Sequence, residues 1–130
     1  MEAIRVLLVD DEKEFVVTLA ERLRLRGFDT TPVVCAEDVF ALIRSEGSPD
    51  VVLLDLKMPD MDGMDVLANI KLFDPSIEVI MLTGHGGDPE GVGAKKGGAF
   101  EYIMKPIDIA ELMVKINQAA AQRRRGLSGS

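Results

Sequence analysis

The chain has 130 residues, of which 47% are hydrophobic and 28% are charged, a composition that suits one compact soluble domain. Its formal net charge of -7 argues against direct binding to nucleic acid, because the phosphates would repel it. No apolar stretch approaches the roughly 20 residues that span a bilayer, and no signal-peptide pattern opens the chain, so we expect a cytoplasmic protein without membrane contact.

Two smaller features add to this picture. The single cysteine, Cys35, leaves no internal disulfide, as is usual in a reducing compartment. The only basic run, Arg123 to Arg125, is interpreted as a solvated helix end that complements the helix dipole, with contact to an acidic partner as the alternative. We expect one domain over residues 1–122 and a flexible tail or linker stub over residues 123–130.

The first half of the chain alternates β-rich apolar runs with segments of helical periodicity. The run from Ile4 to Val9 predicts a strand, and a helix is expected over about residues 12–26. A second run over residues 28–34 contains Pro32, which predicts an edge strand or an irregular segment. A short second helix follows and stops near Gly47.

The same alternation continues in the second half. Val51 to Leu54 is apolar on both alternating faces, which predicts a strand buried from both sides. A third helix is expected over Asp62–Phe73 with its first residue as N-cap, and strands over 77–82 and 100–104; a last helix starts at Asp108. Five strands alternating with five helices predict an α/β fold with a single doubly wound, five-stranded parallel sheet.

The expected fourth helix is unusual because it is rich in glycine. Asp88-Pro89 is a good helix start, with Asp as N-cap and Pro at the first helical position. Gly91 and Gly93, however, each cost a helix about 1 kcal/mol relative to alanine. We therefore predict a short, frayed or mobile helix that makes this face adaptable.

Polar side chains stand where the predicted strands end: Asp10-Asp11, Asp55, Thr83 and Lys105. A parallel sheet brings these ends to one edge, where open α/β folds bind their ligands. Three crowded carboxylates favour a hard divalent cation, and Mg2+ is the usual choice beside phosphate. An ammonium and a hydroxyl suit phosphoryl oxygens, and an aspartate can attack phosphorus to form an acyl phosphate.

Four motifs together identify a family. They are Val9-Asp10-Asp11-Glu12, Asp55-Leu56-Lys57-Met58-Pro59-Asp60-Met61-Asp62-Gly63, Thr83-Gly84 and Lys105-Pro106. From about Ile4 to Ala121 the chain resembles the CheY-like receiver domains of response regulators in two-component signalling. The resemblance implies a flavodoxin-like (βα)5 fold and a phosphoacceptor function.

The resemblance also implies roles for single residues. Asp55 would accept the phosphoryl group and bind Mg2+; Asp11 would bind the ion directly, and Asp10 directly or through water. The backbone carbonyl of Lys57 would complete the protein ligands.

Further roles follow from the resemblance. Thr83 and Lys105 would contact the phosphoryl oxygens, and Pro106 would follow a cis peptide bond. Tyr102 matches the switch aromatic, whose ring would turn inward as Thr83 moves, rearranging the face formed by the fourth helix, fifth strand and fifth helix. His85 is interpreted as a loop residue, with an influence on hydrolysis as the alternative.

The implied partners are a sensor histidine kinase or histidine phosphotransfer protein, and a downstream protein or fused output domain. The domain would catalyse only its own phosphorylation and dephosphorylation, so it would not be an enzyme in the usual sense.

Three rival interpretations fit the sequence less well. A phosphatase of the haloacid-dehalogenase type needs a second acid two residues after the first, where this chain has Lys57. A flavodoxin needs a Ser/Thr/Gly-rich phosphate loop after the first strand, where Asp10-Asp11-Glu12 would repel a flavin phosphate. A receiver-like module that only binds proteins would have no use for the complete set of acids, threonine and lysine.

Overall fold

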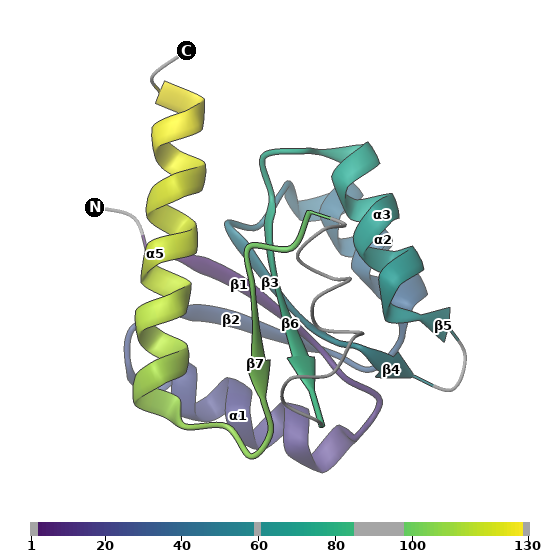
Figure 1. The fold of residues 1–130 in the computed structure, drawn as a ribbon, viewed down its shortest axis with the longest axis vertical. Coiled ribbons are helices and arrows are strands. Elements are labelled where there is room, and N and C mark those ends of the chain that lie inside the picture. The colour runs from purple at the N-terminus through teal and green to yellow at the C-terminus, as the bar shows by residue number, and fades with distance from the viewer. Residues whose placement is uncertain (1–2, 59–60, 85–97, 129–130) are drawn as a thin grey trace.

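A five-stranded, all-parallel sheet forms the centre of the protein in a computed structural model that describes residues 3–58, 61–84 and 98–128. The strand order is β2-β1-β3-β6-β7, as Figure 1 shows. Its members are β1 (Arg5–Val9), β2 (Asp29–Val33), β3 (Val51–Asp55), β6 (Glu78–Thr83) and β7 (Glu101–Met104). The doubly wound parallel sheet predicted from the sequence is confirmed.

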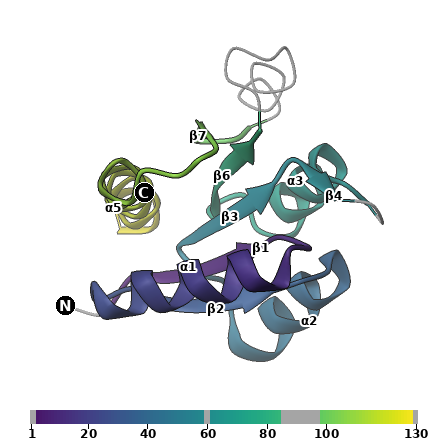
Figure 2. The same ribbon diagram turned by 90° about the horizontal axis from the view of Figure 1, so that it is seen from below.

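Helices cover both faces of the sheet, and Figure 2 shows α1 and α5 separated by the sheet from α2 and α3. The described helices are α1 (Lys13–Leu25), α2 (Ala36–Glu46), α3 (Gly63–Phe73) and α5 (Ile109–Ser128). The helix predicted to start at Asp88-Pro89 lies outside the described residues. In the described part of the chain no helix is both long enough and apolar enough to cross a membrane.

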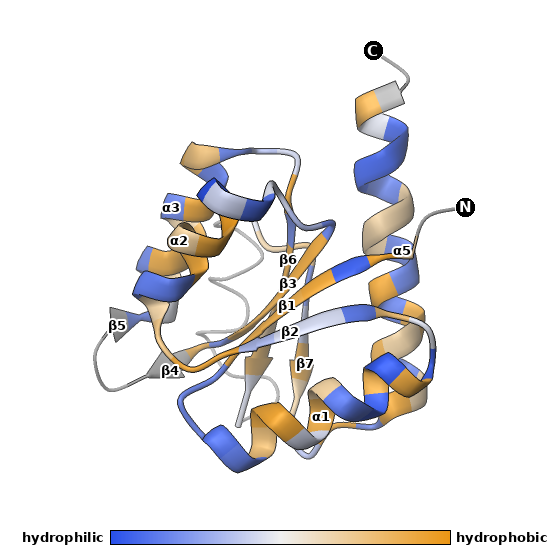
Figure 3. Ribbon diagram, turned by 180° about the vertical axis from the view of Figure 1, so that it is seen from behind, coloured by the Kyte–Doolittle hydropathy of each residue, from blue (hydrophilic) through white to orange (hydrophobic). Residues whose placement is uncertain are grey.

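Strand alternation divides the core into two layers. Leu8 and Leu53 pack on the side of α1 and α5, whereas their neighbours Leu7 and Leu54 pack on the side of α2 and α3. Every residue of β3 is buried, which confirms a strand covered on both faces. The hydropathy colours of Figure 3 show the same contrast, with β1 and β3 mostly hydrophobic and β2 mostly hydrophilic.

The edge position of β2 confirms the prediction made from Pro32. This residue is in register with Leu8 of β1 and has no N–H to donate to a further strand, so an edge strand tolerates it. The start of α3 is also as predicted, because the side chain of Asp62 accepts a hydrogen bond from Met64 N at 2.9 Å. Asp108 likewise accepts from Ala110 N at 2.9 Å at the start of α5.

One small element has no counterpart in the sequence prediction. Directly after β3, the two-residue strands β4 (Lys57–Met58) and β5 (Met61–Asp62) form an antiparallel pair that leads into α3. Strands of two residues carry too little periodicity to be recognised in a sequence.

The C-terminal prediction was wrong for residues 123–128, which continue α5 and do not form a flexible tail. Asp50 explains why the helix continues. This residue directly precedes β3 and is buried, with an exposed fraction of 5%. Arg123 Nη1 and Arg124 Nη2 each donate to its carboxylate at 3.0 Å. Two arginines of the presumed solvated run thus bind an acid of the same chain, while Arg125 is exposed.

Asp50 is held by the first strand as well, since the backbone N–H of Arg5 donates to its Oδ2 at 3.0 Å. Burial alone would raise the pKa of Asp50, but hydrogen bonds from Arg124, the Arg5 backbone and Arg123 outweigh it and lower the pKa below its usual value. The ionised carboxylate therefore joins β1, β3 and α5 at the edge of the sheet opposite the carboxyl ends.

We expect Asp50→Asn to lower the free energy of unfolding by about 1–3 kcal/mol at pH 7, because two guanidinium groups lose their charged partner. Since the folded-state pKa is lowered, this stabilisation is present above the unfolded pKa of 3.8 and is lost as pH falls through the folded value. Urea denaturation of both proteins from pH 7 to pH 3 measures the difference. Asp29→Asn, at an exposed position, is the control, and an equal cost for both variants would contradict the assignment.

Candidate functional site

The carboxyl ends of β1 and β3 bring three aspartates together. Asp10 and Asp11 follow β1, and Asp55 ends the neighbouring strand β3. One carboxylate oxygen from each of the three residues lies within 4.8 Å of the other two. Chain connections leave in opposite directions from these two central strands, which is the position where open α/β sheets bind ligands.

The three acids differ in exposure and in what holds them. Asp10 is fully buried, Asp55 is 8% exposed, and Asp11 is exposed. Asp10 Oδ1 accepts a hydrogen bond from Glu12 N at 2.9 Å, and its own N–H donates to Val33 O at 3.1 Å. Asp10 is thus fixed by β2 and by the start of α1, while Asp11 stays accessible to solvent.

Lys105 brings a positive charge to the three acids from the loop after β7. Its Nζ donates to Asp10 Oδ2 at 2.9 Å and lies 3.9 Å from both Asp55 Oδ1 and Glu12 Oε1. Burial alone would lower the pKa of Lys105, but the hydrogen bond to Asp10 and the charges of Asp55, Asp10 and Glu12 outweigh it and raise the pKa above its usual value. The lysine is therefore a cation with three anionic neighbours.

A backbone hydrogen bond positions Lys105. Its N–H donates to Thr83 O at 2.7 Å, which joins the end of β6 to the end of β7. Thr83 is 3% exposed, at the same edge of the sheet as Asp55. The Lys105–Pro106 peptide bond is cis, as the resemblance implied.

The remaining predicted residues are Tyr102, Lys57 and His85. Tyr102 is half-buried on β7 and packs against the core on the side of α2 and α3, so its switching stays a prediction. Lys57 opens β4 two residues after Asp55, and its role as a carbonyl ligand stays a prediction. His85 lies outside the described residues.

Gly63 supports the site in a way that the sequence motif did not reveal. Its N–H donates to Leu56 O at 3.1 Å, so the first turn of α3 lies against the end of β3. A Cβ at this position would lie 2.5 Å from Leu56 O and 2.9 Å from Asp55 O. Only glycine allows this close approach of the two backbones beside Asp55.

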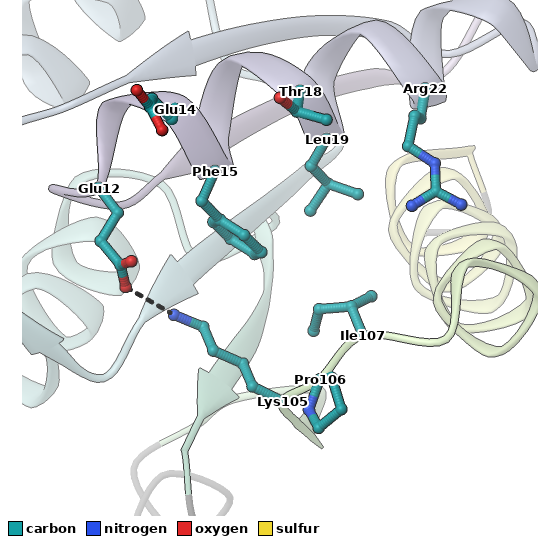
Figure 4. Close-up of a pocket in the computed structure, with 9 residues that line it drawn as sticks. All are labelled: Glu12, Glu14, Phe15, Thr18, Leu19, Arg22, Lys105, Pro106 and Ile107. Atoms are coloured by element: carbon teal, nitrogen blue, oxygen red, sulfur yellow. Dashed lines mark ion pairs between the residues drawn. The ribbon is translucent and has the colours of Figure 1, made fainter.

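A groove of about 680 Å3 opens beside Lys105, between α1 and the loop that follows β7. Figure 4 shows Phe15 of α1 and its N-cap residue Glu12 on one side of it and Lys105 with Pro106 and Ile107 on the other. This groove could not be predicted from the sequence, because Phe15 and Lys105 on its two sides are 90 positions apart in the chain.

The donor set fits a divalent cation. Mg2+ takes oxygen ligands at about 2.1 Å, which places ligands on opposite sides about 4.2 Å apart. Adjacent ligands of the ion lie about 3 Å apart. The three carboxylate oxygens lie within 4.8 Å of one another, so they are close enough to converge on one ion. Lys105 balances only one of the three carboxylate charges, so the cluster retains an excess of negative charge that a divalent ion would neutralise.

Comparisons with known proteins agree with this geometry. The family model of the response regulator receiver domain matches residues 6–117. The chain is 36% identical over 124 residues to the transcriptional regulatory protein PrrA of Mycobacterium bovis, and this covers 94% of the chain and 51% of PrrA. It is also 36% identical to the DNA-binding transcriptional regulator NtrC of Proteus hauseri, and this covers 95% of the chain and 26% of NtrC.

A crystal structure of a CheY-like response regulator receiver domain protein from Methanospirillum hungatei has the same fold, with a TM-score of 0.87 and 28% identity. That match covers 96% of this chain and 99% of the solved one. It confirms the predicted flavodoxin-like arrangement. The chain spans about half the length of PrrA and about a quarter of the length of NtrC.

We expect Gly63→Ala to destabilise the protein by about 1–3 kcal/mol and to weaken divalent-cation binding, because the added Cβ must push α3 away from the backbone of Asp55 and Leu56. Urea denaturation and an NMR titration with Mg2+ measure the two effects. Gly126→Ala is the matched control, since a Cβ there meets no atom within 4 Å. Unchanged cation affinity in a destabilised Gly63→Ala protein would show that Gly63 serves the fold alone.

Proposed function

The chain belongs to the response regulator receiver domain family of two-component signalling, and from that premise we propose that Asp55 is its phosphoacceptor, with Mg2+ held by Asp10, Asp11, Asp55 and the Lys57 carbonyl. One observation carries this proposal. Asp55 ends a strand that is buried along its whole length, within one small cluster that contains two further carboxylates and the ammonium of Lys105. Such a cluster has the charges that phosphoryl transfer to a carboxylate needs.

The reaction is an in-line displacement at phosphorus. A carboxylate oxygen of Asp55 forms the new O–P bond as the P–N bond of a phosphohistidine on a partner protein breaks, and the imidazole, which carries a proton on its other ring nitrogen, leaves with the electron pair. Bound Mg2+ would neutralise charge on the phosphoryl oxygens. The product is an acyl phosphate that carries roughly two negative charges.

Lys105 and Thr83 stabilise that new charge. Lys105 already lies 3.9 Å from Asp55 Oδ1, so it exchanges a carboxylate contact for a phosphoryl oxygen without a long movement. Thr83 offers a hydroxyl from the end of the neighbouring strand β6. Because Thr83 O also accepts the N–H of Lys105, a shift of one strand end is passed to the other.

The response we propose is a population shift of the face around β7. Movement of Thr83 toward the phosphoryl group would allow the Tyr102 ring to turn inward, and a partner that prefers this state would bind it. The domain catalyses only its own phosphorylation and dephosphorylation in this proposal.

We propose a sensor histidine kinase or histidine phosphotransfer protein as donor. The output is a downstream protein or fused domain, which is supported by the transcriptional regulators that resemble this chain over part of their length. The net charge of -7 supports an output without direct nucleic-acid contact by this domain.

We expect Asp55→Asn to abolish labelling by phosphoramidate in the presence of Mg2+, because the amide cannot form a stable acyl phosphate. Intact-protein mass spectrometry measures the labelled fraction. Asp65→Asn, an exposed aspartate on α3, is the matched control and should label like the wild type. Continued labelling of Asp55→Asn would place the phosphoacceptor elsewhere.

We expect Mg2+ to raise the melting temperature of the wild type, because an ion at ten times its Kd stabilises the folded state by about 1.4 kcal/mol. Asp11→Asn should lose most of this shift, since it removes an accessible ligand of the cluster. Differential scanning calorimetry with and without Mg2+ measures the effect, with Asp65→Asn again as the control. An equal shift in Asp11→Asn would exclude Asp11 as a ligand.

A further inference from the structure

Within the described residues, the ammonium of Lys105 also lies close to a side chain that is not a carboxylate. Its Nζ lies 4.7 Å from the centroid of the Phe15 ring, within the roughly 6 Å at which an aromatic face attracts a cation. Both side chains are partly withdrawn from water, since Phe15 is half-buried and the Lys105 side chain is 22% exposed. A cation–π contact is stronger when it is desolvated in this way.

The ring lies near Glu12 at the start of α1. Phe15 lies in the first turn of α1, and Glu12 is the N-cap residue three positions earlier. Figure 4 shows both side chains directed toward Lys105 across the groove. The start of α1 therefore offers the ammonium a carboxylate and an aromatic face together.

The carboxylates and the ring differ in what happens when a phosphoryl group arrives. Asp10 and Asp55 compete with phosphoryl oxygens for the ammonium, because all of them are anions. The ring carries no net charge, so it has no such competition. It can keep its contact with the ammonium while the lysine exchanges its anionic partner.

We propose that Phe15 is a positioning residue for phosphoryl transfer, which holds the Lys105 ammonium at the site through the face of its ring. This inference rests on the proposed function of Asp55 and Lys105. The competing explanation is that Phe15 only packs against the core between α1 and α5, which it partly does. The two explanations differ in whether the effect of Phe15 depends on Lys105.

The rate test uses Phe15→Leu, which removes the aromatic face but keeps an apolar side chain, and Phe15→Tyr, which keeps the face. Labelling by phosphoramidate at saturating Mg2+ avoids any partner that docks in the groove. We expect Phe15→Leu to slow labelling about two- to tenfold and Phe15→Tyr to stay within about twofold of the wild type. Phe73→Leu, an exposed phenylalanine on α3, is the control and should change nothing.

A double-mutant cycle then asks whether Phe15 acts through Lys105. In a Lys105→Ala background, Phe15→Leu should change the rate less than about twofold, because the cation that the ring contacts is gone. An undiminished effect in that background would overturn the proposal and leave Phe15 as a packing residue. Equal rates for Phe15→Leu and Phe15→Tyr would overturn it as well.

A spectroscopic measurement tests the contact without Mg2+ or phosphorylation. Protons bonded to Lys105 Cε should resonate upfield in the wild type and in Phe15→Tyr because of the ring current, and should return toward their usual position in Phe15→Leu. No upfield shift in the wild type would contradict the proposal even if Asp55 is labelled. Conversely, a clear shift in a protein that is not labelled at Asp55 would reject the proposed function and retain the contact.

Discussion

Negative charge crowded at the carboxyl ends of two adjacent strands is the constraint on which the rest of this structure depends. Asp10, Asp11 and Asp55 lie within reach of a single ion, and Lys105 balances only part of their charge. A folded protein tolerates such a cluster only beside cations, and the Lys105 ammonium is one such cation. The excess negative charge destabilises the site in the absence of a cation. The same excess favours the binding of Mg2+ and, with it, the transfer of a phosphoryl group.

The strand β3 has an aspartate at each end, and the negative charge of these two residues is balanced in different ways. Before the strand, Asp50 is bound by two guanidinium groups and a backbone N–H, contacts that need no outside ligand. After the strand, Asp55 has a lysine at 3.9 Å and two further acids as neighbours. The contacts of Asp50 attach α5 to the sheet. The cluster around Asp55 retains negative charge that a ligand can neutralise. One end of β3 therefore serves the fold and the other end forms the candidate site.

Much of the fold could be predicted because it rests on local patterns. The all-apolar run Val51 to Leu54 identified a strand buried on both faces, Pro32 identified an edge, and Asp62 identified a helix start. The site residues could be grouped for a related reason. Parallel strands carry their carboxyl ends to one edge, so residues that follow strands in sequence must approach each other in space.

What the sequence alone determined is therefore the order of the elements and the chemistry at their ends. Only the tertiary structure revealed the contacts between residues that are far apart in the sequence and share no helical or strand periodicity. Asp50 meets Arg123 across 73 residues and extends α5 where a tail was expected, Gly63 lies against the backbone of Asp55, and the ring of Phe15 faces Lys105. The physical reason is that side-chain pairing and close backbone approach depend on distances between packed elements, which periodicity and propensity do not specify.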